Sequence, residues 1–587
     1  MNFLKSTHLL VQFIKAKWYI YTSGILFITV ANIVQAYYPK ILGNFTDQLK
    51  IGELTKPMVV DYSLLLMGVG VTFAILAGIG QFHIMYVGRI FEFFTRKRLF
   101  DHFTTLSESF YSKNGVGKLL SFVMNDVTTV RESISMGVNQ SVNALMLLLS
   151  AIFFMLFTTS IPSYLIVVCV IPMLIIPWIV VRFGPVIRKR SLTVQQSLAR
   201  MTESAEEQFG GIRVTKKFAV EPIMNDRFGN TVDTLRDNQL RLVRVSSLFQ
   251  ALIPFLGALS LMVTIGLGGY LTIENHITLG EFVALCFYIR MMVNPLQQIG
   301  NVINTMQRSR ASLERLNDLL GMRSEIQEID SAQAIDLHNT SIRINHLSFS
   351  YPDATQEALH DIDLDIEPGT IVGIIGRTGS GKTTLMKLLL RIYEPPEGTV
   401  WVGETDIREM TLESLREQIA YVPQEGFLFS TSIRDNIAFF QRNTAFEYVE
   451  RAAKQAQIYS NIAELPEQFD TKLGERGVTL SGGQRQRTSL ARGIIKNAPI
   501  MILDDSVSAV DSVTENDIIA ELRLGRKNKT TIIIAHRISA LKYADLIIVL
   551  DKGRIVQRGT HQELLDQKGI YAMLHSIQEE GNPHVED

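Results

Sequence analysis

Six long apolar stretches in the first half of the chain constrain its fold more than any other feature. A helix needs roughly 20 residues to cross the hydrocarbon core of a bilayer, and each stretch is about that long. After them, short apolar runs separated by turn signals are typical of a soluble domain in which strands alternate with helices. We expect membrane-spanning helices near residues 18–40, 61–86, 134–158, 162–183, 246–271 and 279–302.

The distribution of Lys and Arg orients these helices. The second-to-third and fourth-to-fifth connections are rich in both residues, whereas the third-to-fourth and fifth-to-sixth turns contain neither. By the positive-inside rule, the two basic connections and both termini face the cytoplasm. The formal net charge of −1 leaves no general basic field for a nucleic-acid partner.

The two basic connections keep apolar residues at helical spacing, which predicts that the membrane helices continue into the cytoplasm. Two glycine-bearing breaks interrupt them, one at Gly115 and one at Gly211. We expect a short transverse helix at each break, through which a soluble domain could move the membrane helices.

Neither a cysteine metal site nor a cleaved signal peptide is expected from the sequence. Cys169 and Cys286 both lie in apolar runs, far from other metal-ligating residues, and are interpreted as small core residues. The N-terminal segment around Lys5 and Lys15 has no small-residue cleavage site, so no cleaved signal peptide is expected.

A glycine-rich loop in the second half indicates phosphate binding. The apolar run at 370–376 reads as a buried strand, and a helical pattern follows the loop. In this setting backbone amides cradle phosphates, a lysine neutralises the β and γ phosphates, and a Thr hydroxyl reaches magnesium. The predicted ATP-binding residues of the loop are Gly376, Arg377, Thr378, Gly379, Ser380, Gly381, Lys382, Thr383 and Thr384. A second buried strand ends at Asp504, a carboxylate suited to holding magnesium.

A second anion-binding motif lies at the start of a predicted helix. It consists of Ser481, Gly482, Gly483 and Gln484. The first loop does not need this motif for its own nucleotide, so one chain carries two half-sites. The economical arrangement is a head-to-tail pair of soluble domains, and a second chain is therefore required.

With these motifs in order, the chain resembles a half-size ABC exporter from the first helix to about residue 575. The resemblance implies that Tyr351 stacks on adenine, that Gln424 touches magnesium and links to the membrane domain, and that His536 contacts the γ phosphate. It also implies that Asp511 acts across the dimer interface and that the loop at 473–477 senses the cytoplasmic helices. The implied cofactors are ATP and Mg²⁺.

The expected fold follows from both arguments. It is an all-α transmembrane domain of six helices over residues 1–310, followed by an α/β P-loop nucleotide-binding domain over 341–580. A linker is expected over 311–340 and a disordered tail over 581–587. The protein is expected in the bacterial cell membrane, working by alternating access.

One position departs from the family pattern. Exporters that hydrolyse ATP well place Glu after the magnesium aspartate, and here Asp505 stands there. A side chain shorter by one methylene should hold the attacking water poorly, because roughly 1 Å of misplacement can lower a rate on the order of 100-fold. The serine motif is intact, so we expect a heterodimer whose partner supplies a Glu. A slow homodimer is the alternative.

Polar residues within the predicted spans are candidates for a substrate path. They are Gln35, His83, Arg290 and Asn294. Arg290 lines the path, pairs with an acid of the partner or, if the span is shifted, lies near the membrane interface. Methionine and aromatic residues nearby would suit amphipathic small molecules. By family resemblance we expect multidrug export, with lipid or peptide export as alternatives.

Three other classes compete with an exporter. A soluble chromosome or DNA-repair ATPase would need a long coiled coil between the two motifs, and about a hundred residues separate them here. A nutrient importer would carry its ATP-binding domain on a separate chain. The third alternative is an ATP-gated channel or membrane sensor of the same architecture, which sustained current would identify.

Overall fold

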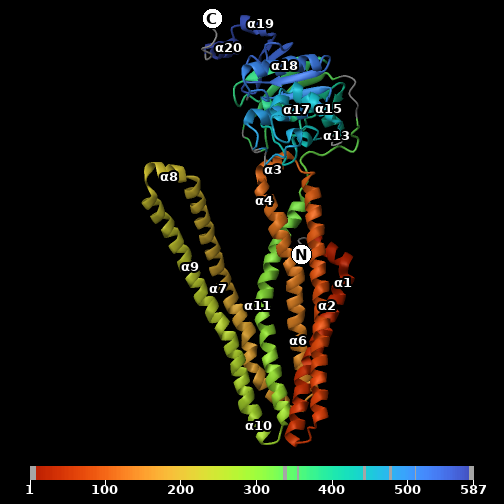
Figure 1. Ribbon diagram of the computed structural model, residues 1–587, viewed down its shortest axis with the longest axis vertical. Coiled ribbons are helices and arrows are strands. Elements are labelled where there is room, and N and C mark those ends of the chain that lie inside the picture. The colour runs from red at the N-terminus through yellow and green to blue at the C-terminus, as the bar shows by residue number, and fades with distance from the viewer. Residues whose placement is uncertain are drawn as a thin grey trace. The chain divides into compact units, whose positions relative to one another are not determined.

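The computed structural model describes two units, shown in Figure 1. The first contains the described residues up to Thr105 and from Asn114 to Met322. The second contains Leu106–Lys113 and the described residues from Arg323 onward. The predicted tail lies outside the described residues, which are 8–334, 340–352, 354, 356–439, 444–474, 477, 479–508 and 510–580.

The first unit is entirely helical in its described part and has six stretches long and apolar enough to cross a membrane. This confirms the predicted number of spans. Three short π-helical segments, η1 to η3, interrupt the third and fifth stretches. The elements are α1 (His8–Ile51), α2 (Lys56–Phe103), α4 (Val116–Ser121), η1 (Phe122–Asp126), α5 (Val127–Glu132), η2 (Ser133–Gly137), α6 (Val138–Phe157), α7 (Ser163–Gly210), α9 (Glu221–Val263), η3 (Thr264–Gly268), α10 (Gly269–Ile273) and α11 (Leu279–Gly321).

Several of these helices are far longer than a bilayer requires. Helix α7 has 48 residues, or about 72 Å at about 1.5 Å per residue, more than twice the roughly 30 Å of a hydrocarbon core. The predicted extension beyond the membrane is therefore present. Helix α11 runs to Gly321, inside the segment predicted as a linker, and Gln333 later in that segment pairs with Met410.

Short helices lie at both predicted glycine breaks. Helix α3 (Glu108–Asn114) ends before Gly115, whose φ of +70° favours glycine, and α8 (Ile212–Phe218) begins after Gly211. All of α3 except its last residue belongs to the second unit. Helix α8 packs against α7 and α9, which lie side by side and lean away from α1, α2 and α6 toward α8 (Figure 1).

The second unit has two sheets with helices around them. In the larger sheet, of order β10-β9-β3-β8-β7-β6, all neighbours are parallel except β10 and β9. The smaller sheet, β2-β1-β4-β5, is antiparallel. The strands are β1 (Ile342–Phe349), β2 (Leu359–Ile366), β3 (Ile371–Gly376), β4 (Val400–Val402), β5 (Thr405–Asp406), β6 (Ile419–Val422), β7 (Ile500–Asp504), β8 (Thr530–Ile534), β9 (Leu546–Asp551) and β10 (Arg554–Gly559).

The helices of this unit are mostly short, and several begin with a side-chain cap. Thr411, Ser432, Ser481 and Asp511 each accept a hydrogen bond from a backbone N–H of the following turn. The helices are α12 (Lys382–Leu389), α13 (Leu412–Glu417), α14 (Ile433–Ile437), α15 (Phe446–Gln455), α16 (Tyr459–Ala463), η4 (Gln468–Asp470), α17 (Gly482–Ile495), α18 (Ser512–Gly525), α19 (His561–Asp566) and α20 (Ile570–Glu580).

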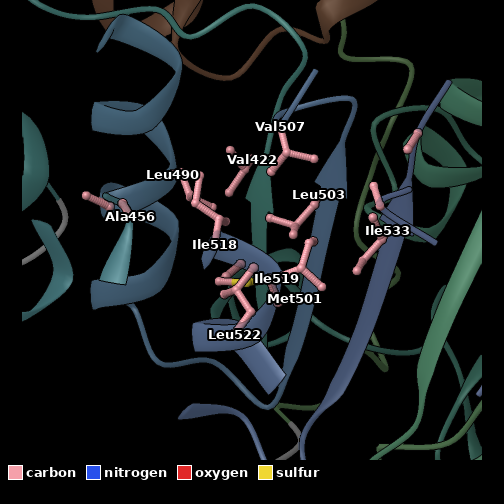
Figure 2. Close-up of a cluster of buried hydrophobic side chains, with 14 of the residues drawn as sticks. Val422, Ala456, Leu490, Met501, Leu503, Val507, Ile518, Ile519, Leu522 and Ile533 are labelled. Carbon is pink, nitrogen blue, oxygen red and sulfur yellow. The ribbon is translucent and has the colours of Figure 1, made fainter. Parts of the chain in front are cut away.

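The larger sheet is buried on both faces, and β7 shows why its sequence is continuously apolar. Ile500 and Ile502 pack into one hydrophobic cluster, whereas Met501 and Leu503 pack into another, because side chains alternate along a strand. Figure 2 shows the second of these clusters, where residues of β7 lie with Leu490 of α17 and with residues of α18. Both layers hold β7 in place, and Asp504 stands at its end.

Candidate functional site

The phosphate loop connects β3 with α12 at the centre of the larger sheet, where β3 lies between β8 and β9. Gly379 and Gly381 have φ of +80° and +100°, in the left-handed region that favours glycine. A Cβ at Gly376 would stand 2.1 Å from the carbonyl oxygen of Leu550, and one at Gly381 would stand 2.7 Å from Leu359 Cδ2. Only glycine fits these two positions, so the sequence folds into the backbone cradle that a phosphate needs.

Lys382 closes this loop. Its side chain is buried, and Nζ donates hydrogen bonds to the carbonyl oxygens of Gly376, at 2.8 Å, and Arg377, at 3.0 Å. Burial lowers the pKa of the Lys382 ammonium, while the carboxylates of Asp505 and Asp504 oppose that shift. The ammonium is thus held within the loop, where the β and γ phosphates of a nucleotide would lie.

Asp504 is positioned by two hydroxyl groups. Oδ1 accepts a hydrogen bond from Thr383 Oγ1 at 3.4 Å, and Oδ2 accepts one from Tyr421 Oη at 3.0 Å. Burial raises the pKa of Asp504, and these two hydrogen bonds partly offset the increase. A Thr hydroxyl beside a carboxylate supplies the hard oxygen ligands that magnesium prefers, so these residues fit the predicted metal.

Asp505 follows Asp504 with a φ of +47°, which is uncommon for a residue with a side chain. Its Oδ2 accepts a hydrogen bond from Gln424 Nε2 at 3.1 Å, whereas Oδ1 is buried with no partner among the described residues. The carbonyl oxygen of Asp505 accepts hydrogen bonds from Gln486 Nε2, at 2.8 Å, and Ser508 Oγ, at 2.9 Å. The backbone is fixed from two sides, and one carboxylate oxygen is left to hold a water.

The predicted adenine residue also contacts the phosphate-loop helix. Tyr351 Oη lies 2.9 Å from Thr384 Oγ1 on α12. Its ring packs edge to face against Tyr393, at 5.0 Å between centroids, and against Phe349, at 5.3 Å. Lys387 of the same helix lies over the Tyr393 ring and forms an ion pair with Glu108 of α3 at 2.7 Å. Aromatic ring, loop helix and α3 are therefore joined in one chain of contacts.

The predicted second motif lies apart from this group. Ser481 and Gln484 form a capping box at the start of α17, with Ser481 Oγ accepting from the Gln484 N–H at 3.2 Å. Ser481 and Gly482 are exposed, and Gly483 is half-buried. Within the part of the chain that the structure describes, no hydrogen bond joins Ser481 to the phosphate loop. An exposed helix N-terminus is suited to an anion brought by another molecule.

Two further predicted residues are also outside the phosphate-loop group. Asp511 caps α18 by accepting from the Thr514 N–H at 3.0 Å, and this hydrogen bond lowers the pKa of its carboxyl. His536 is exposed, and its carbonyl oxygen accepts from Gln578 Nε2 at 2.7 Å. The predicted sensing loop at 473–477 includes Glu475 and Arg476, which lie outside the described residues.

Three of the four predicted substrate-path residues come together. Gln35, Arg290 and Asn294 line one cavity of about 610 Å³ in the first unit. His83 does not line it: its Nδ1 lies 2.8 Å from the Ile79 carbonyl oxygen. On α2 the cavity is lined as far as Phe73, and ten further residues move His83 about 15 Å along the helix.

The sequence reasoning missed several residues of the nucleotide site. Tyr421, Gln486 and Ser508 bind the two aspartates, and Tyr393 packs against Tyr351. Gln486 lies two residues beyond the serine motif, in the first half of α17, and its position in that helix is the one sequence signal that could have identified it.

Comparisons with known proteins agree with this architecture. Residues 21–296 match the family described as ABC transporter transmembrane region, and residues 359–508 match the family described as ABC transporter. The chain is 35% identical over 566 residues, 95% of each chain, to a probable multidrug resistance ABC transporter ATP-binding/permease protein, YheI, of Bacillus subtilis. It is 34% identical over 483 residues to an ATP-dependent lipid A-core flippase of Syntrophus aciditrophicus, covering 82% of this chain and 80% of the flippase.

The fold is also similar to that of a bacterial Atm1-family ABC exporter solved with ATP bound. The TM-score is 0.79 with 24% identity, covering 98% of this chain and 99% of that one. Six apolar helices and these relatives place the protein in the plasma membrane, with the nucleotide-binding domain in the cytoplasm. The chain belongs to the ABC transporter family as a half-size exporter, in which an ATPase that uses ATP and magnesium is coupled to transport.

Proposed function

We propose that this chain is one subunit of a heterodimeric exporter of amphipathic small molecules, and that its own ATP site hydrolyses slowly. Half-size exporters work as dimers, and here each of the two nucleotides would lie between the phosphate loop of one chain and the serine motif of the other. The observation that carries the proposal is Asp505, which stands where efficient family members have Glu.

The surroundings of Asp505 support slow chemistry. Its carboxylate is one methylene nearer the backbone than a Glu carboxylate would be, and Oδ2 is already engaged by Gln424. The left-handed backbone is held by Ile534, Gln486 and Ser508 through the Asp505 amide and carbonyl. The backbone therefore has little freedom to move forward and compensate, and the attacking water would be held too far from its target.

The rest of the site is suited to binding. The glycines of the loop, Lys382 and the Thr383–Asp504 pair are arranged as an ATP and magnesium site requires. We infer that His536 and Gln424 complete this site when the two chains close, and that Ser481 and Asp511 act on the nucleotide of the partner. This subunit would then hold ATP as a clamp while the partner's nucleotide is hydrolysed.

The dimer requirement has support in the first unit. The hairpin of α7 and α9 ends at α8, where Phe209 and Phe218 are 75% and 73% exposed. Aromatic residues this exposed at the end of a cytoplasmic hairpin suit a surface that a second chain covers. The substrate class rests on the relatives, one described as a multidrug resistance transporter and one as a lipid A-core flippase.

The mechanism we infer is alternating access. Binding of ATP closes the two nucleotide domains, the cytoplasmic helix ends follow, and the cavity opens outward. Lys382 and the loop amides would neutralise the phosphates, and Thr383 and Asp504 would hold magnesium. Hydrolysis at the partner's site would reset the pair.

The test compares the ATPase rate of the purified chain with that of Asp505→Glu. We expect a nearly silent parent and a gain of about 10- to 100-fold in the variant. Asp505→Asn is the matched control and should stay silent, because an amide cannot act as the carboxylate does. Brisk turnover by the parent alone would mean that the chain works as a homodimer, and the heterodimer proposal would then fail.

A further inference from the structure

The cavity in the membrane unit contains an arginine. It has a volume of about 610 Å³ and is lined by parts of α1, α2, α6 and α11. Tyr38, Phe73, Phe287 and Met291 give it apolar surface. Arg290 brings a positive charge to the same space, so the cavity combines an adaptable apolar lining with a fixed cation.

Three polar residues of this cavity lie on one face of α11. Arg290, Asn294 and Gln298 follow one another at intervals of four on α11, which places them on one face of the helix. Gln35 of α1 and Asn143 of α6 also line the cavity. The Oε1 atom of Gln298 is buried with no hydrogen-bond partner among the described residues. Arg290, Asn294 and Gln298 therefore form a polar stripe along an otherwise apolar cavity, and Gln298 Oε1 can still accept a hydrogen bond.

Arg290 lies deep in the span. It is eleven residues beyond Leu279, where the 20-residue candidate span begins, or about 16 Å along a helix axis. A bilayer core is roughly 30 Å thick, which places this backbone position about halfway across the span. An uncompensated cation at this depth is costly and in membrane proteins usually faces a functional cavity.

Several other arginines of this unit have acidic partners. Arg131 lies 3.3 Å from Glu92, and Arg315 lies 2.5 Å from Asp126. Among the described residues that line the cavity none is acidic, and the structure gives Arg290 no hydrogen bond or ion pair within the described part of the chain. The described residues therefore leave the charge of Arg290 uncompensated, and a bound ligand can supply the counter-charge.

We infer that the cavity takes an anionic amphiphile, with a single carboxylate, sulfonate or phosphate on Arg290 and an apolar tail against the aromatic residues. This inference rests on the proposed export function and names its substrate class. A planar guanidinium binds such oxyanions through two parallel hydrogen bonds. Asn294 and Gln298 are placed to donate to further oxygens of the headgroup.

The experiment measures binding without nucleotide, using the full-length chain in nanodiscs of zwitterionic lipid. The probes are a fluorescent fatty acid and the fatty alcohol with the same tail and fluorophore, each corrected for partition into empty nanodiscs. We expect the acid to bind at least about tenfold more tightly than the alcohol, equivalent to about 1.4 kcal/mol. Arg290→Gln should remove this preference, whereas Arg290→Lys should retain most of it.

Arg182→Gln is the matched control, because Arg182 lies in the same unit but does not line the cavity. It should leave both affinities unchanged. Displacement of the acid by added anionic phospholipid would identify a lipid headgroup as the source of the anion. Displacement only by soluble amphiphiles would identify a free compound, and either result supports the shared chemistry.

Three results would overturn the inference. They are equal binding of acid and alcohol by the parent, equal loss of both in Arg290→Gln, and loss of the preference once a partner chain is bound, since that would show a partner acid on Arg290. None of these readouts uses ATP hydrolysis. A failure here is therefore separate from a failure of the proposed heterodimer, which the Asp505→Glu comparison detects.

Discussion

The two motifs predicted to bind phosphate are built in different ways. The phosphate loop is cross-linked by its own chain: Lys382 bonds to the loop, Thr383 to Asp504, and Gln424 to Asp505. The Ser481 motif is exposed, and the contacts of its serine side chain are those of a helix cap. The phosphate loop is thus held in place by contacts within its own chain, whereas the exposed Ser481 motif would need a partner chain to complete the proposed second nucleotide site.

This difference explains how a subunit could lose one function and keep the other. In the proposed arrangement, changes at Asp505 would act on the nucleotide held by this chain, whereas changes at Ser481 would act on the nucleotide of the other chain. Selection on the two motifs would then be separable in a heterodimer and inseparable in a homodimer. Variants at the two motifs and at the residues that support them would test that separation.

Removing the lysine of the loop should strongly weaken nucleotide binding. Lys382→Met takes away the cation that the loop holds against two carbonyl oxygens, and hydrogen bonds to charged groups contribute up to about 3 kcal/mol. We expect ATP affinity to fall about 100-fold in a fluorescent-nucleotide titration. Lys568→Met, on the surface after α19, is the control and should bind normally. Unchanged affinity in Lys382→Met would show that this loop is not the nucleotide site.

Ser481→Ala should lower turnover at the opposite site without weakening ATP binding to this chain. In the Asp505→Glu background, where a homodimer should turn over, we expect a fall of about 30-fold in ATPase rate from the loss of one hydrogen bond to a charged group. Ser460→Ala, on α16, should have no effect.

Mixing subunits sharpens this prediction. Dimers of a Ser481→Ala chain with a Lys382→Met chain, both carrying Asp505→Glu, contain one site with both defects and one intact site. Their activity should exceed that of either variant alone. Absence of any gain would contradict the assignment of Ser481 to the opposite nucleotide.

Tyr421→Phe should weaken the magnesium affinity of the loop's own site by a smaller factor. The hydroxyl donates to Asp504 Oδ2 at 3.0 Å, and a hydrogen bond of this kind contributes about 1 kcal/mol. We expect the magnesium concentration for half-maximal nucleotide binding to rise about fivefold. Tyr448→Phe, exposed on α15, is the matched control. An unchanged magnesium profile would mean that Tyr421 does not orient Asp504.

The smallest expected effect concerns the ion pair between Glu108 and Lys387, which joins α3 to the phosphate-loop helix. A double-mutant cycle with Glu108→Gln and Lys387→Met should give a coupling of about 0.5 kcal/mol in thermal unfolding, as partly exposed pairs do. A coupling of zero would show that α3 is not tied to the side of the domain that holds this chain's nucleotide.

The sequence was sufficient for the parts of the molecule that depend on local pattern. The apolar spans, the strand, loop and helix around Lys382, and the short helices at Gly115 and Gly211 all follow from residues adjacent in the chain. The capping of α17 by Ser481 follows from the same kind of signal, since a Ser with Gln three residues later is a capping box.

Contacts between distant residues were not predictable. Tyr421 lies 83 positions from Asp504, which its hydroxyl binds, and Glu108 lies 279 positions from Lys387. Tyr421 reads as one more apolar strand residue, and Glu108 as a solvated helix charge, because neither carries a local signal of its partner. Whether His83 lines the cavity depends likewise on how far the cavity extends along α2. The spacing of polar residues within the span carries no information on that length.

The backbone conformation of Asp505 also affects the stability of the folded domain. A φ of +47° is tolerated several-fold more often by Asp and Asn than by longer side chains, so Glu at this position would have to bear a conformational penalty that Asp largely avoids. A subunit that does not need to hydrolyse its own ATP does not need Glu at this position, and it therefore avoids that penalty. Asp then adopts this turn with less backbone strain than Glu would. We expect Asp505→Glu to raise the ATPase rate and to lower the thermal stability of the domain.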